Sequence, residues 1–158
     1  MRTRELDVRV HAPRAAFDLA SRHAREALPD ETGGILTGWR VGAEVVIDAF
    51  IEVRDHRATR RGYWRRENRA SRALAEYLQM ADNPALGYVG EWHSHPLPQM
   101  ASRTDIASIR SIAKQVPGPV ALVVLMIDPA RGTVRADTRV AVHESLRTAV
   151  FSVPLDLR

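Results

Sequence analysis

The sequence predicts an α+β domain in which a mixed β-sheet is flanked by helices, and three observations support this prediction. The chain has 158 residues, of which 45% are hydrophobic, so it can bury a core, and its length favours a single domain over residues 1–158. Segments with strand and helix patterns follow one another as strand, helix, several strands, helix, strand, helix and strands. The apolar run from Val120 to Ile127 is typical of a buried central strand.

The first third of the chain predicts a strand, a helix and a hairpin. We expect a strand over Leu6–Ala12 and a helix over Pro13–Leu28, with the proline in the first helical turn. Two strands, Gly33–Arg40 and Ala43–Arg54, would form a hairpin around Val41-Gly42. The predicted helix has an apolar face that should be buried, made of Ala16, Phe17, Ala20, Ala24, Ala27 and Leu28.

The middle of the chain predicts a polar loop, a second helix and a strand. The loop is Asp55 to Gly62, and the helix spans Glu67 to Met80. The strand starts at Leu86 and runs to His95, and Pro96 ends it because proline cannot donate to a ladder. The inward face of the helix would contain Ala70, Ala73, Leu74, Tyr77 and Leu78.

The last part of the chain predicts a helix and three strands. The helix spans Ser102 to Gln115, and Val120 to Asp128 forms the buried strand. A turn at Pro129–Gly132 separates that strand from two more, Thr133–His143 and Arg147–Leu155. The apolar stripe of the helix is Ile106, Ile109, Ile112 and Ala113.

Four polar residues near the end of the predicted strand point to a metal site. His93 and His95 are two residues apart, so on a strand both side chains project from the same face. Ser102 and Asp105 are three residues apart, so on the first turn of the next helix they lie side by side. Two imidazoles and a carboxylate suit zinc, and three protein ligands leave a fourth position for water. Taken alone, Ser102 and Asp105 are more typical of a capping pair at a helix start.

A further part of the candidate site lies upstream, at Pro29 to Gly38. Here Glu31 and two glycines, Gly33 and Gly34, stand at the start of an apolar strand. This pattern is compatible with an ordinary turn, in which the glycines supply unusual dihedral angles. It also allows Glu31 to act as a general base, because a zinc-bound water needs a nearby carboxylate to accept its proton.

The chain resembles the JAB/MPN-domain metallopeptidases, whose JAMM motif is matched by Glu31-Thr32-Gly33-Gly34-Ile35-Leu36-x-Gly38, His93-x-His95-Pro96 and Ser102-x-x-Asp105. The stretch from Gly90 to Pro96 is similar to the compact bacterial branch, which includes deconjugating peptidases encoded beside ubiquitin-like transfer enzymes, in anti-phage systems among others. The resemblance extends from about Asp7 to the C-terminus, and it implies the MPN fold, which is cytidine-deaminase-like.

The resemblance also implies a role for each matched residue. His93, His95 and Asp105 would bind one Zn²⁺ per chain, Glu31 would be the catalytic base, and Ser102 would help to stabilise the oxyanion. The chain departs from the family in one place, because the loop from Pro96 to Ala101 is one residue shorter than usual.

Other families with a His-x-His pair fit the sequence less well. A barrel amidohydrolase needs at least ~200 residues. A metallo-β-lactamase-like site would need an Asp-His pair just after His95, where Pro98-Gln99 stands. A cupin would need a glutamate a few residues after the pair and a later histidine, but Asp105 is the first acidic residue after His95.

Composition limits the remaining possibilities. The chain has no cysteine, which excludes disulfides, cysteine nucleophiles and thiolate metal sites. The start, Met1 to Glu5, lacks an apolar signal core and no segment is long enough to span a membrane, so we expect a cytoplasmic protein. The net charge is +4 and comes almost wholly from arginine, because Lys114 is the only lysine.

The segment from Arg57 to Arg72 contains seven arginines, one acid, a tyrosine and a tryptophan. It is compatible with a solvated helix face and loop, or with a docking surface for a partner. Nucleic acid is a weaker interpretation, because no nucleic-acid-binding motif accompanies the arginines.

Three functions follow, and the first is the best supported. It is zinc-dependent isopeptidase activity on a ubiquitin-like protein or its conjugate, at the bond after a C-terminal glycine, with transfer enzymes of the same operon as possible partners. The second is processing of a sulfur-carrier precursor, whose Gly-Gly end would use the same site. The third is a catalytically silent MPN scaffold, which the retention of Glu31, His93, His95, Ser102 and Asp105 argues against.

Overall fold

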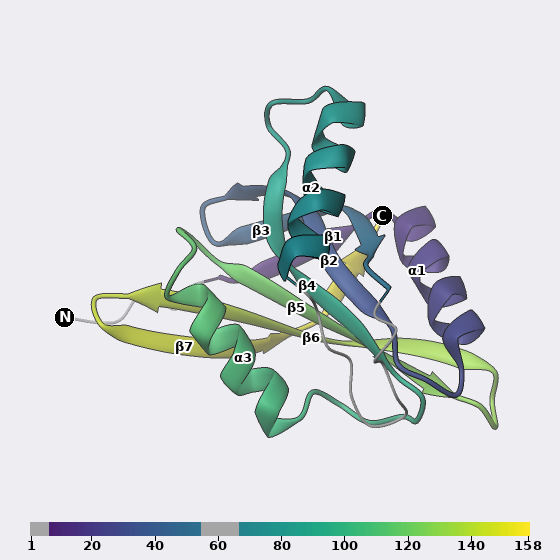
Figure 1. Cartoon of the computed structure of the whole chain (residues 1–158). Coiled ribbons are helices and arrows are strands. Elements are labelled where there is room, and N and C mark those ends of the chain that lie inside the picture. The colour runs from purple at the N-terminus through teal and green to yellow at the C-terminus, as the bar shows by residue number, and fades with distance from the viewer. Residues whose placement is uncertain (1–6, 55–66) are drawn as a thin grey trace.

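The fold is a mixed β-sheet with helices on both faces (Figure 1). The computed structural model describes residues 7–54 and 67–158. Leu6, the predicted loop from Asp55 to Gly62 and most of the arginine-rich segment, residues 57–66, lie outside the described residues. Within the described residues, the sheet has eight strands and the chain forms three helices, so the predicted α+β class is confirmed.

The described strands form one sheet in the order β7-β6-β5-β4-β2-β3-β1-β8. Parallel pairs join β4 to β5, β1 to β3 and β1 to β8, and the other neighbours are antiparallel. The sheet is therefore mixed, as the sequence predicts. The strands are β1 (Arg9–Ala12), β2 (Gly33–Val41), β3 (Glu44–Glu52), β4 (Gly87–His95), β5 (Val120–Asp128), β6 (Thr133–Glu144), β7 (Arg147–Val153) and β8 (Leu155–Leu157).

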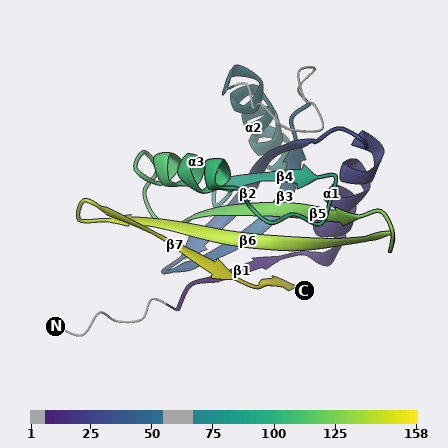
Figure 2. The ribbon, with the colours of Figure 1, turned by 90° about the horizontal axis from the view of Figure 1, so that it is seen from below.

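The helices divide between the two faces of the sheet. Helix α1 (Arg14–Ala27) buries Phe17 in the same apolar cluster as Trp92 of β4. On the opposite face, α2 (Glu67–Ala81) buries Ala70 against Ile35, and α3 (Arg103–Ala113) buries Ile109 against Val124. Figure 2 shows α2 and α3 together on one side of the sheet.

This division decides what surrounds the histidines. Because side chains alternate along a strand, Trp92 faces the core beneath α1, whereas His93 and His95 face the side of α2 and α3. Strand β4 lies between β2 and β5 in the middle of the sheet, so its C-terminal end is held on both sides by hydrogen-bonded neighbours.

Some element boundaries differ from those predicted. Pro13 is the N-cap of α1 in extended conformation, and α1 ends at Ala27, which leaves Leu28 exposed instead of buried. Ser102 is the N-cap of α3, not its first helical residue. The predicted last strand is two strands, because Pro154 interrupts it and β8 pairs in parallel with β1.

Candidate metal centre

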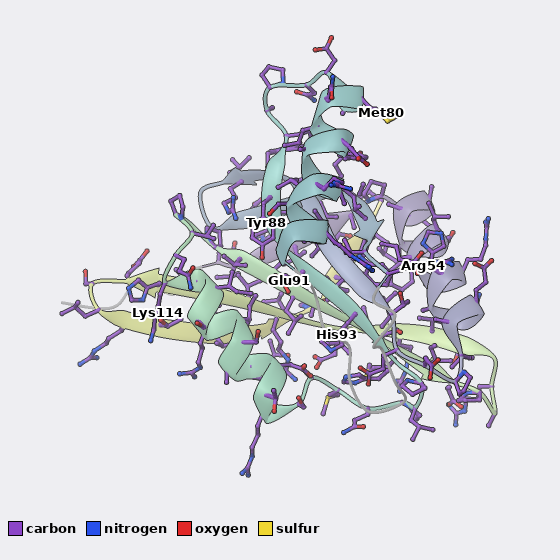
Figure 3. All side chains as sticks on the ribbon, viewed as in Figure 1. Arg54, Met80, Tyr88, Glu91, His93 and Lys114 are labelled. Carbon is purple, nitrogen blue, oxygen red and sulfur yellow. The ribbon has the colours of Figure 1, made fainter. Side chains whose placement is uncertain are left out.

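Two histidines converge at the C-terminal end of β4. His93 and His95 lie on one face of the strand, and their ring centroids are 5.0 Å apart. The two Nε2 atoms are separated by 3.2 Å. Figure 3 shows His93 toward the end of β4, beyond Glu91 and Tyr88 on the same strand.

The carboxylate of Asp105 faces both imidazoles from the first turn of α3. Asp105 Oδ1 lies 3.4 Å from His93 Nε2, and Asp105 Oδ2 lies 3.7 Å from His95 Nε2. In residues 7–54 and 67–158, these three side chains form the one group of His, Cys, Asp or Glu that could hold a metal ion, with all ligand atoms within 4.8 Å of one another. The structure thus brings together the three residues that the sequence analysis offers as ligands.

The separations suit a tetrahedral zinc ion. Two nitrogen ligands at 2.0–2.1 Å from zinc, subtending a tetrahedral angle, are about 3.3–3.4 Å apart. The Nε2 atoms of His93 and His95 are 3.2 Å apart, close to this value, and Asp105 offers Oδ1 at 3.4 Å from His93 and Oδ2 at 3.7 Å from His95. The donor set also leaves a fourth position, which distinguishes an open zinc site from a closed structural one.

His95 is held in the form that binds a metal. Its Nδ1 is 2.6 Å from the backbone oxygen of Gln99. A carbonyl oxygen can only accept, so Nδ1 carries the proton and Nε2 of the neutral ring has its lone pair free. Burial lowers the pKa of His95, which also favours the neutral ring. A hydrogen bond of this kind, behind a ligand, fixes both ring orientation and tautomer.

Ser102 and Asp105 also form a capping box. Ser102 Oγ accepts from the backbone N–H of Asp105 at 3.1 Å, and the backbone N–H of Ser102 donates to Asp105 Oδ2 at 2.6 Å. The helix-capping interpretation is therefore confirmed. It is compatible with the metal-site interpretation, because one carboxylate oxygen lies close to Ser102 N and the other faces His93.

These contacts keep Asp105 anionic. Burial by itself would raise the pKa of Asp105. The hydrogen bond and positive charge of His93, together with the hydrogen bonds from Ser102, outweigh burial and hold that pKa well below its usual range. An ionised carboxylate is the form that a divalent cation requires.

Glu31 is buried next to the segment that pairs with the histidine strand. The backbone N–H of Ser94 donates to Thr32 O at 2.8 Å, and Ser94 Oγ accepts from Thr32 N–H at 3.0 Å. Gly33 pairs with His93, so continuing this antiparallel register by two residues places Glu31 opposite His95. Glu31 is 9% exposed and is not one of the three converging side chains.

Gly33 explains why a glycine stands at this point of the motif. A Cβ at Gly33 would lie 2.4 Å from the backbone oxygen of Trp92 and 2.8 Å from both Cα and Cβ of His93. Since these are mainly backbone atoms in a hydrogen-bonded sheet, no neighbour can move aside cheaply. The glycine thus lets β2 approach β4 closely where the first histidine projects.

Two acids were missed by the sequence analysis, the partly buried Glu52 and the buried Asp137. Glu52 of β3 accepts from Thr32 Oγ1 at 2.8 Å and lies 3.4 Å from His23 Nδ1 of α1. Asp137 of β6 accepts from the backbone N–H of Ala101 at 2.8 Å and from Arg139. For Asp137 the available signal was an acid at an inward position of a predicted strand, followed two residues later by an arginine on the same face.

Comparisons with known proteins agree with this fold. A family profile described as prokaryotic homologs of the JAB domain matches residues 13–140. The solution structure of protein DSY2949 from Desulfitobacterium hafniense is similar, with a TM-score of 0.68 and 16% identity over 94% of this chain and 92% of that chain. No curated protein matches the sequence. Among the described helices, none is both long and apolar enough to cross a membrane.

Proposed function

The chain belongs to the prokaryotic homologues of the JAB domain, and from that premise we propose that it is a zinc-dependent isopeptidase. The substrate would be a ubiquitin-like protein, cleaved after its C-terminal glycine, either to release it from a target lysine or to remove a C-terminal extension. The observation that carries the proposal is the convergence of His93, His95 and Asp105, whose ligand atoms all lie within 4.8 Å of one another.

The proposed ligands hold one ion and leave room for water. His93 and His95 would bind through Nε2, and Asp105 through its carboxylate. When bound, zinc would lower the pKa of its water from 15.7 toward ~7, and it would also polarise the scissile carbonyl. The Gln99 carbonyl behind His95 keeps that ring in the correct tautomer throughout.

Glu31 and Ser102 would then move protons and stabilise charge. Glu31 would accept the proton of the water and return it to the departing amine, as a general base followed by a general acid. Its position supports this role, because the register of β2 and β4, continued by two residues, places the buried Glu31 opposite His95. Ser102 Oγ already accepts from Asp105 N–H, so its own proton is available for the developing oxyanion.

Two other functions use the same premise. A sulfur-carrier precursor also ends in Gly-Gly, so the same residues would process it, and competing substrates in one assay would separate the two. A catalytically silent scaffold would bind its partner without zinc. For the isopeptidase we propose a cytoplasmic location and transfer enzymes of the same operon as partners. The proposal includes no membrane partner, and nucleic acid stays the weakest of the partner interpretations.

The first test is zinc content by elemental analysis of the purified protein, wild type beside Asp105→Ala. About one zinc per chain in the wild type and none in the variant supports the site. A wild type that takes up no zinc after resupply would instead favour the scaffold.

The second test separates chemistry from metal binding. Glu31→Gln should keep its zinc and lose turnover on Gly-Gly-tailed substrates by about 10²–10⁴-fold, the usual contribution of a general base. Wild-type turnover in this variant would exclude Glu31 as the base.

A further inference from the structure

We propose that Asp137 is a positioning residue for the metal centre, which it serves by fixing the point where the loop of residues 96–101 enters α3. The proposal rests on the proposed zinc site and names a residue outside its ligands and its catalytic groups. Asp137 and its partner Arg139 determine zinc affinity by holding Ala101 in place. Ala101 in turn fixes Ser102 and Asp105.

Asp137 lies in the same row of the sheet as the first histidine. It is opposite Val124 of β5, and Val124 is opposite His93 of β4. Paired residues of adjacent strands project from the same face, so Asp137 shares the face on which His93 and α3 lie. It is 7% exposed, which is unusual for an aspartate.

Both carboxylate oxygens of Asp137 are occupied. Arg139 donates from Nε to Oδ1 and from its terminal nitrogen to Oδ2, each at 3.0 Å. Oδ2 also accepts the backbone N–H of Ala101 at 2.8 Å. The guanidinium therefore orients the carboxylate in a two-pronged contact, and the carboxylate fixes one backbone group of the loop.

The residue that is fixed stands directly before the capping box. Ala101 precedes Ser102, whose backbone N–H donates to Asp105 Oδ2 at 2.6 Å. A shift of Ala101 would move Ser102 and would be passed on to the carboxylate that faces His93 and His95. Two residues earlier in the loop, Gln99 O accepts from His95 Nδ1. The loop is thus attached to the metal centre at one point and to Asp137 at the other.

The sheet itself does not need this ion pair. Replacing a buried ion pair by well-packed apolar residues is often neutral or stabilising, so such a pair is weak evidence for a stability role. The neighbour of Asp137 in the row, Val124 of β5, is a fully buried apolar residue. Asp137 is also not a fourth metal ligand, since it is outside the converging group and its oxygens accept three donors.

The test is zinc affinity, measured by competition with a chromophoric chelator on folded, metal-free protein. We expect Asp137→Ala to bind zinc about 10- to 100-fold more weakly than the wild type, the usual cost of removing a group behind the ligands. Asp137→Asn retains an acceptor for Ala101 but loses the charge that Arg139 grips, and its loss should be smaller, about three- to tenfold. The matched control is Asp156→Ala, which removes another aspartate paired with an arginine two residues on, in β8, and should leave zinc affinity unchanged.

A double variant distinguishes positioning from a general effect of charge or stability. Asp105→Ala should lose its zinc on purification, so its weaker binding through His93 and His95 is titrated at high zinc concentration. If Asp137 acts through Asp105, adding Asp137→Ala to Asp105→Ala should weaken this remaining affinity by less than about twofold, because the affected ligand is already absent. Equal and additive losses in both backgrounds would overturn the proposal. Thermal unfolding of each metal-free variant accompanies the titrations, since a purely structural role would lower the melting temperature and leave the affinity of the folded protein intact.

The outcomes separate this inference from the proposed function. A wild type that binds zinc, beside an Asp137→Ala variant that binds it equally well, overturns the inference alone. A wild type that binds no zinc overturns the proposed function first. If Asp137→Ala does not fold, wild-type affinity in Asp137→Asn overturns the inference.

Discussion

The protein contains two clusters in which histidine meets carboxylate, and they differ in where the ring nitrogens point. At the metal centre, the Nε2 atoms of His93 and His95 face each other at 3.2 Å with Asp105 beside them. Near the other edge of the sheet, His11 of β1 has Nδ1 2.8 Å from Asp156 Oδ2 of β8. Its Nε2 is 3.4 Å from Glu44 Oε2 of β3, at ion-pair distance but without hydrogen-bond alignment.

The two clusters therefore differ in whether a bound cation would stabilise them. His11 has an acid at each nitrogen, and its contacts join three neighbouring strands, β3, β1 and β8. At the metal centre, two ring nitrogens and an anionic oxygen converge on one point, an arrangement that a bound cation would stabilise. Convergence of three possible ligand atoms on one point, more than the mere presence of His and Asp, therefore marks the metal site.

The largest expected effect comes from removing one histidine from each cluster. Zinc at a thousandfold excess over its Kd should raise the free energy of unfolding of the wild type by about 4 kcal/mol. His93→Ala should abolish this zinc-dependent gain because it removes a ligand. His11→Ala should keep the whole gain, since the cluster in β1 is proposed to bind no metal. Chemical denaturation with zinc and with a chelator measures both.

The same experiment gives the expected cost of His11 itself. Without zinc, His11→Ala should lower the free energy of unfolding by about 1–3 kcal/mol, because it removes a buried imidazole and its hydrogen bond with the Asp156 carboxylate. A zinc-dependent gain that disappeared in His11→Ala would mean that the two clusters are not functionally distinct.

Local patterns were sufficient to predict the residues that converge. The period of two in β4 places His93 and His95 on one face, and the Ser-x-x-Asp pattern marks the start of α3 whatever its function. A strand, a loop and a helix start that follow one another in sequence leave little freedom for where Asp105 can go. The predicted mixed sheet is confirmed for the same reason, since every strand except β8 has its own pattern.

What the sequence could not supply comes from contacts between distant segments. Asp137 reaches Ala101, and Glu52 reaches Thr32, only after the sheet has formed. The separate strand β8 depends on parallel pairing with β1, at the far end of the chain, which no local pattern specifies. The roles of Glu31 and Ser102 and the identity of the metal remain predictions.

A glycine substitution can displace the metal centre without disturbing the cluster around His11. Gly33→Ala should lower the free energy of unfolding by about 1–3 kcal/mol, the usual cost of overpacking, because its Cβ meets the backbone of Trp92 and His93. It should also weaken zinc binding, since any relaxation moves His93. The matched control is Gly87→Ala on β4, where a Cβ would meet nothing within 4 Å and the change should stay within about 0.5 kcal/mol. Thermal melts and zinc titrations that ranked the two variants equally would contradict the close-approach argument.

The smallest expected effect concerns Ser102, in which capping and chemistry meet. Ser102→Ala should lower the free energy of unfolding by about 1 kcal/mol through loss of the helix cap, whereas Ser102→Gly should cost only a few tenths. Both variants lose the same hydroxyl, so a loss of turnover shared by the two reports the hydroxyl and not the cap. Ser102→Thr keeps a capping oxygen and a proton, and it should retain both properties. A turnover that followed stability across the three variants would show that Ser102 serves the metal centre only through Asp105, as the N-cap that holds this ligand in place.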